Sequence, residues 1–148
     1  LSSLLVHRKI ALDFVAANGV DLLLAIDKNS LPAVVVATCL YYLAYSTDVM
    51  EKVCLLPECA LDRLVEYCVF LLEHGYESGR AAATMFFTHA LQFRPILERF
   101  DQVDGLRRIL NCVSTLKLLQ EDCDDVLSDE QLYTSFQAIR NTCAAFRR

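Results

Sequence analysis

Apolar residues recur every three or four positions along most of the chain, which is the spacing of helices that bury one face. The stretch 59–75 shows this most clearly, because its apolar positions form one stripe and Gly75 follows the last of them. That stripe consists of Leu61, Leu64, Val65, Cys68, Leu71 and Leu72. A second stripe, in 106–120, consists of Leu106, Ile109, Leu110, Val113, Leu116 and Leu119. The pattern predicts an all-α protein.

The predicted helices fall into three groups of three. They span 7–19, 20–27 and 31–46 in the first group, 47–56, 59–75 and 78–93 in the second, and 96–105, 106–120 and 128–148 in the third. The acidic stretch 121–127 is predicted to be a solvated loop before the last helix.

Polar residues predict where several of these helices begin. Ser30 is expected to cap a helix that holds Pro32 in its first turn. Thr47 or Asp48 is expected to cap the next helix. Ser128–Gln131 has the spacing of a capping box, which predicts the start of the last helix.

Glycine and proline predict the helix ends. Gly19 is expected to end the first helix in the left-handed conformation that glycine adopts without strain. Pro57 and Pro95 lack the amide hydrogen that a continuing helix needs, so they are expected to close the helices before them.

One short pattern recurs at similar intervals and predicts a repeat. Gly19-Val20, Ala60-Leu61 and Gly105-Leu106 each open the second helix of a group, and Val20, Leu61 and Leu106 are 41 and 45 residues apart. Armadillo and HEAT repeats have periods of ~40–47 residues, and a three-helix unit favours armadillo. We predict an armadillo-like helical-repeat solenoid segment with repeats 4–46, 47–94 and 95–148, continuing into a longer solenoid. Chance recurrence of two glycine-ended helices in an ordinary all-α domain is the alternative.

Composition and charge narrow the class of protein and of partner. The chain has 148 residues, 55% of them hydrophobic and only seven of them Gly or Pro, which is typical of one packed domain. Its net charge of −5 disfavours nucleic acid and anionic membranes as partners. The uncharged stretch 29–47 is predicted to be a buried helix and not a membrane span, because Pro32, Thr38 and polar ends interrupt it.

No residue pattern in the chain indicates chemistry. The seven cysteines include no CxxC pair, and the three histidines are far apart and form no HExxH motif. The run at 121–125 lacks the glycine and final glutamate of a calcium loop. We therefore expect structural thiols, a half-buried His89, and no catalytic, cofactor or metal site. A Cys–His pair that meets only in space is the alternative.

Two sets of residues are candidates for contacting a protein partner. In armadillo stacks the third helix of each repeat lines the concave groove. On the first such helix, Tyr41 and Tyr45 lie one turn apart, and aromatic pairs suit partner contact. On the second, a polar stripe recurs every four residues and consists of Arg80, Thr84, Thr88 and Gln92. The alternative is that the tyrosines belong to the core and the stripe faces water.

Arg107 and Arg108 form a third candidate. Two adjacent arginines near the start of a helix are unfavourable unless an acidic group compensates them. The acidic loop around Asp124, from this chain or a neighbouring one, is the partner we expect.

Several long strings resemble the Vpr-binding protein family. They occur in order through all three groups and read "HRKIALDFVAANGV", "CLYYLAYSTDVMEKVCLLP", "ATMFF", "FDQVDGLRRILN" and "STLKLL". The sequence departs from the family where "NGV" replaces a common double glycine, and the likeness is loosest in the acidic loop and last helix.

The resemblance implies a role in protein ubiquitination. Members of this family are substrate receptors of cullin-4 RING ubiquitin ligases, with an armadillo-like region, a LisH dimerisation motif and a WD40 propeller. It implies ligase components and substrates as partners, self-association of the parent protein, and a nuclear location with the cytoplasm as second compartment. Kinase activity has been attributed to the family, but this chain lacks the glycine-rich loop and DFG motif that a kinase needs. An armadillo adaptor outside ubiquitin biology is the alternative function.

Overall fold

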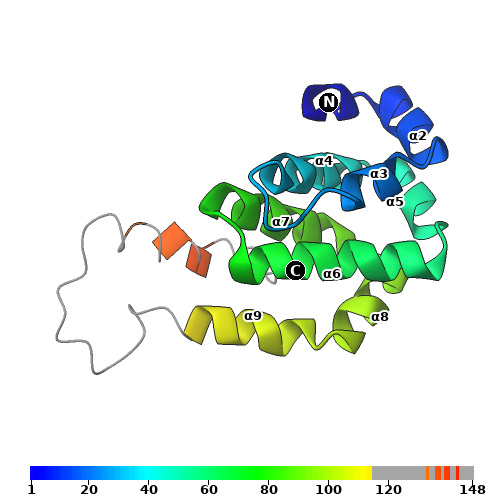
Figure 1. The fold of residues 1–148 in the computed structure, drawn as a ribbon. Helices are drawn as coiled ribbons and strands as arrows, with labels where there is room; N and C mark the ends of the chain where they lie inside the picture. Colours follow the sequence, from blue (N-terminus) through cyan, green and yellow to red (C-terminus); the bar gives the residue numbers. More distant parts are fainter. Residues whose placement is uncertain (115–132, 134–135, 138, 141–142, 144–148) are drawn as a thin grey trace, which may run out of the picture.

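The computed structural model describes residues 1–114, 133, 136–137, 139–140 and 143 (Figure 1). Over residues 1–114 the chain forms helices and no strand, which confirms the predicted all-α fold for this part. The helices are α1 (Ser2–Leu5), α2 (Arg8–Ala16), α3 (Gly19–Leu24), α4 (Ala33–Tyr45), α5 (Thr47–Cys54), α6 (Glu58–His74), α7 (Glu77–Ala90), α8 (Arg94–Gln102) and α9 (Gly105–Ser114). The predicted acidic loop and most of the helix predicted at 128–148 lie outside the described residues.

Helices at corresponding places in the predicted groups pack on one another. α2 contacts α5, α3 contacts α6, and α4 contacts α7, which is the most extensive of these contacts. α6 contacts α9 as well, and Figure 1 shows α6 running between α7 and α9. Neighbouring units that bury their apolar faces against each other define a helical-repeat segment. The armadillo class and the repeat boundaries stay predictions.

The core runs through the middle of this stack. Its largest fully buried side chains are Leu5, Leu40, Leu43, Met50, Leu64, Leu71, Phe86, Phe87 and Ile96. α4 carries no charged residue and places seven of its residues in the interior. Among the helices that are described, none is by itself both long and apolar enough to cross a membrane; α4 and α5 reach that composition only together, across a bend of 107°.

Two connections between helices share one geometry, and it corrects the prediction for Gly19. The left-handed residues are Asn18 (φ 57°) and Asp104 (φ 56°), each one position before the glycine. Asn and Asp tolerate this conformation better than other residues that carry a Cβ. Each of them ends one helix and precedes the next, so Gly19 and Gly105 are the first residues of α3 and α9.

Two predicted helix starts and the predicted role of the prolines also need correction. Ser30 does not cap α4, because its hydroxyl donates to the Asp27 carbonyl and Pro32 occupies the N-cap position. α5 is preceded by Ser46, and neither Thr47 nor Asp48 caps it. Pro95 lies in the first turn of α8, where a proline costs no hydrogen bond, and α7 has already ended at Ala90. Gly75 ends α6 as predicted, whereas Pro57, which is predicted to close the helix before it, is the N-cap of α6, and α5 has already ended at Cys54.

Candidate protein-contact surface and a neighbouring pocket

The two predicted contact tyrosines join an aromatic cluster between α4 and α7. The Tyr45 ring is 6.1 Å from that of Tyr41 and 5.4 Å from that of His89, measured between ring centres. Tyr45 is 65% exposed, whereas Tyr41 and His89 are half-buried. Burial, and then the neighbouring tyrosines, raise the pKa of Tyr41. In this cluster the Tyr45 ring is accessible to a partner, and the half-buried rings of Tyr41 and His89 pack beside it.

The predicted polar stripe on α7 is not one solvent-facing surface. Thr84 is 2% exposed, so it does not lie on the surface. Its hydroxyl donates to the Arg80 carbonyl at 2.9 Å, and the Thr88 hydroxyl donates to the Thr84 carbonyl at 2.9 Å. Such bonds back to the preceding turn satisfy a threonine inside a helix. Gln92 is exposed but lies beyond the end of α7.

Arg107 and Arg108 do have acidic partners among the described residues. Arg107 pairs with Asp104, three residues earlier. The guanidinium of Arg108 donates two hydrogen bonds to the carboxylate of Glu73 on α6, one of them of 2.7 Å from Nε. This bidentate bond holds the pKa of Glu73 below its usual range. Arg108 therefore joins α9 to α6, and the loop around Asp124, which is the partner expected from the sequence, lies outside the described residues.

The thiols lie in different environments. Cys39 and Cys68 are buried, Cys54 is half-buried, and Cys59 and Cys143 are exposed. Burial raises the pKa of Cys39, Cys54 and Cys68 and so disfavours the reactive thiolate. Within the described part of the chain, no group of three or more His, Cys, Asp or Glu side chains is arranged to hold a metal ion.

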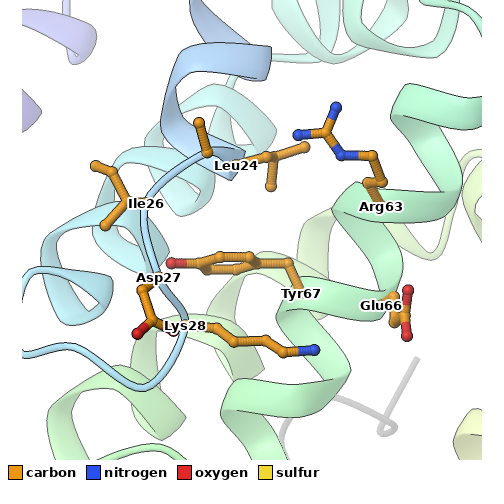
Figure 2. Close-up of a pocket in the computed structure, with 8 residues that line it drawn as sticks. Leu24, Ile26, Asp27, Lys28, Arg63, Glu66 and Tyr67 are labelled. Carbon is orange, nitrogen blue, oxygen red and sulfur yellow. The ribbon is translucent and has the colours of Figure 1, made fainter.

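A pocket of about 300 Å³ lies where α6 faces the chain segment after α3. Leu24 and Ile26 come from that side, and Arg63 and Tyr67 from α6. Figure 2 shows the Tyr67 ring lying between Arg63 and Lys28, with its hydroxyl directed at the segment that carries Ile26. The pocket exists because α3 has six residues and α6 has 17, so α3 covers only part of its neighbour.

Tyr67 is the unusual residue of this pocket. It is 6% exposed, and its hydroxyl has no hydrogen-bond partner among the described residues. Burial, then Cys68 and Asp27, raise its pKa to about 12. The pocket is lined by two acidic and two basic residues, so their formal charges sum to zero. They are Asp27, Glu66, Lys28 and Arg63. Sequence reasoning missed both this pocket and the Glu73–Arg108 pair, because each joins residues at least 35 positions apart.

A family model matches the first part of the chain. The Mahjong helical domain matches residues 1–57, which cover α1 to α5 and the connection that follows.

Curated relatives match the whole chain. DDB1- and CUL4-associated factor homolog 1 of Caenorhabditis elegans is 50% identical over 147 residues, which are 99% of this chain and 9% of that protein. Protein mahjong of Drosophila melanogaster is 38% identical over 153 residues, 100% of this chain and 10% of its own length. DDB1- and CUL4-associated factor homolog 1 of Arabidopsis thaliana is 30% identical over 150 residues, 100% of this chain and 8% of its own.

The chain thus spans about a tenth of the length of the curated relatives that it matches. Their names support the resemblance to the Vpr-binding protein family.

Proposed function

We propose that this chain is an armadillo-type scaffold within a substrate receptor of a cullin-4 RING ubiquitin ligase. The observation that carries the proposal is the 50% identity, over 99% of the chain, with a relative named as a DDB1- and CUL4-associated factor. The stacking of α2 on α5, α3 on α6 and α4 on α7 supports the repeat architecture. In this proposal the chain belongs to a nuclear protein that also enters the cytoplasm.

The scaffold acts by holding geometry and by offering protein-contact surfaces. Ubiquitin transfer is performed by the partner RING subunit and its E2 enzyme, and this chain is not catalytic. A stack of helical units suits that task, because each unit contacts only its neighbours and the stack sets the distance between its ends. Tyr45 and the exposed side of α7 are the places where a recruited protein would bind.

The decisive experiment is affinity purification of the intact natural protein, with and without residues 1–148, followed by mass spectrometry. We expect the intact form to recover cullin-4 and DDB1. Partners that disappear on deletion belong to this segment. Recovery of no ligase component by the intact form would refute the ligase assignment and leave a helical-repeat adaptor of another pathway.

Point variants separate a contact surface from a folding effect. Tyr45→Ala and Arg80→Glu in the intact protein are expected to lose partners that the deletion also loses. Leu55→Ala is a control, because Leu55 is 76% exposed and lies at the end of α5, not on α4 or α7. If Tyr45→Ala and Arg80→Glu fold and retain every partner, the α4–α7 surface is not a binding site.

Thiol labelling tests the enzyme alternative. A catalytic cysteine has a lowered pKa and reacts quickly near neutral pH. We expect Cys39 and Cys68 to label only on unfolding, because burial raises their pKa values. Cys59 is exposed and is expected to react at the rate of an ordinary thiol. Labelling of any cysteine well above that rate would favour an enzyme.

A further inference from the structure

The second helices of the last two units differ in how far their apolar stripes are covered. The pattern that opens α6 and α9 aligns these helices at an offset of 45 residues, so that Leu61 and Val65 of α6 correspond to Leu106 and Leu110 of α9. Leu61 is 2% exposed and Val65 0%, whereas Leu106 and Leu110 are each 64% exposed. α9 therefore presents to solvent an apolar face whose counterpart on α6 is buried.

The helix that covers α6 most extensively is the third helix of its own unit. Among the described helices that contact α6, α7 makes the largest contact, and it follows α6 after Gly75 and Tyr76. α7 also packs along α4, the third helix of the unit before it. A third helix thus lies against the second helix of its own unit and against the third helix of the preceding unit. Continued by one unit, this arrangement places a helix against α9 and α7.

The chain itself contains a segment suited to this place. The described residues of the last predicted helix have helical backbone. Phe136, Ile139 and Cys143 recur at intervals of three and four residues, so they form one apolar stripe. Beside this stripe the Gln137 amide donates to the Tyr133 hydroxyl at 3.1 Å. Phe136 is 59% exposed, so its stripe, like the face of α9, lacks full cover.

The chain between the two helices is long enough to bring them together. α9 has ten residues and is therefore about 15 Å long. The connection 115–132, which lies outside the described residues, can span up to about 60 Å. It can therefore reach any point along α9. Contact between the two apolar faces removes both from water, which favours their association.

We propose that the segment 133–143 packs as a helix on the exposed face of α9, with Phe136 and Ile139 against Leu106 and Leu110. The same helix lies along α7, as α7 lies along α4. The third unit is then completed by residues of this chain. This packing does not depend on any association with a ubiquitin ligase.

Photo-crosslinking in the intact natural protein tests this contact. A benzophenone amino acid replaces Leu106, and the protein is produced as a mixture of light and heavy isotopic forms. We expect position 106 to cross-link to the peptide that contains residues 136–143, with both ends of the cross-link carrying the same isotope. The same reagent at Leu22, which is 69% exposed on α3, is the matched control and is expected to give no cross-link to that peptide.

Hydrogen exchange in two variants of the intact protein gives a second readout. Phe136→Ala removes the aromatic contact with α9 and is expected to speed exchange of the α9 amides by about tenfold. Tyr133→Ala is the matched control, because Tyr133 is 62% exposed, close to the 59% of Phe136, and lies beside the apolar stripe. We expect that variant to change exchange in α9 by less than about twofold.

Four outcomes would overturn the proposal. A cross-link between light and heavy forms would show that a second copy covers α9, and a cross-link to another segment or another protein would show a different occupant. Absence of any cross-link above the Leu22 level would show that the face is open. Equal exchange in α9 for Phe136→Ala and Tyr133→Ala would contradict the contact as well. None of these measurements involves a ligase component, so their failure is distinct from failure of the ligase assignment.

Discussion

The corner between α2 and α3 and the corner between α8 and α9 use the same backbone in different surroundings. In each, a phenylalanine is followed four residues later by a left-handed Asn or Asp and then by a glycine. A Cβ on Gly19 would overlap the Phe14 ring, and one on Gly105 would overlap the Phe100 ring. Phe14 is half-buried, whereas Phe100 is 2% exposed. The two corners are therefore expected to lose different amounts of stability when their glycine is replaced.

The corner between α5 and α6 shows that the repeat does not require this device. Pro57 precedes α6 with φ −54° and ψ 147°, and no residue of that connection is left-handed. A glycine corner is needed only where the aromatic ring of the preceding helix packs directly on the first residue of the next. The phenylalanine, not the repeat period, explains why the motif occurs twice.

The largest effect is expected from Gly105→Ala. The Phe100 ring packs on Phe87, with ring centres 5.0 Å apart, and is enclosed by the core. It cannot move away from an added methyl group, so the variant is expected to lose about 3 kcal/mol of unfolding free energy through overpacking. Urea denaturation measures the loss.

Gly79→Ala is the control for that substitution. A Cβ at Gly79 would lie 3.4 Å from Val34 Cγ2, an ordinary contact, and Gly79 is inside α7. Alanine favours a helix over glycine by up to about 1 kcal/mol. An equal loss of stability in both variants would mean that the Phe100 ring is not the cause.

The second helices of the two corners are also attached to α6 differently. Arg108 of α9 binds Glu73 in a bidentate pair whose side chains are 30% and 17% exposed. Asp21 of α3 meets Arg63 at 3.2 Å, with both side chains about half exposed. Glu73→Gln is expected to lose about 2 kcal/mol, because a partly buried guanidinium loses its charged partner. Asp21→Asn is expected to change stability by less than about 0.5 kcal/mol.

The pH dependence of stability tests the contribution of the Glu73–Arg108 pair. The pKa of Glu73 is lowered in the folded protein from its ordinary value of 4.5. Its contribution to stability is therefore complete above about pH 4.5 and is lost as the pH falls toward the lowered value. We expect the difference between wild type and Glu73→Gln, followed by denaturation at several pH values, to shrink below pH 4.5. A constant difference would show that the ion pair does not stabilise the fold.

Sequence reasoning found the helices but not the partners of their polar residues. Helical spacing and the positions of Pro57 and Gly75 predict α2 to α9, because these signals are local. The sequence predicts the left-handed conformation at Gly19 and not at Asn18, because the reason for the glycine, the Phe14 ring, is visible only in the folded chain.

The candidate surface was predicted less well for the same reason. Tyr45 is exposed as a contact residue must be, but Thr84 is buried, although both came from the same kind of one-turn spacing. Spacing places residues on one face of a helix and does not say which neighbour covers that face. The partners of Arg107 and Arg108, Asp104 and Glu73, likewise depend on how α9 packs on α6.

Gly19→Ala sharpens the comparison of the two corners. Phe14 is half-buried, so its ring can swing toward solvent when a methyl group is added beneath it. The expected loss is about 1 kcal/mol, a third of that for Gly105→Ala. Equal losses for the two variants in urea denaturation would show that ring burial does not set the cost.

The smallest effect is expected where α6 faces the segment after α3. The Tyr67 hydroxyl is buried without a hydrogen-bond partner among the described residues, whereas Glu73 on the same helix is bonded to α9. Tyr67→Phe removes the desolvated hydroxyl and keeps the ring, so we expect unchanged stability or a gain of up to about 1 kcal/mol at neutral pH.

Alkaline pH should separate the Tyr67→Phe variant from wild type. The pKa of Tyr67 rises from 10.0 to about 12 on folding, so the unfolded chain ionises first. Wild type then loses stability as the pH rises from 10 toward 12, and the phenylalanine variant lacks this contribution to the loss. Thermal unfolding of both proteins between pH 9 and 11 measures it. Destabilisation by Tyr67→Phe at neutral pH would mean that the hydroxyl bonds to the Ile26–Asp27 segment. The polar groups of Tyr67 and Glu73 would then both have hydrogen-bond partners, and the two residues of α6 would not differ in this respect.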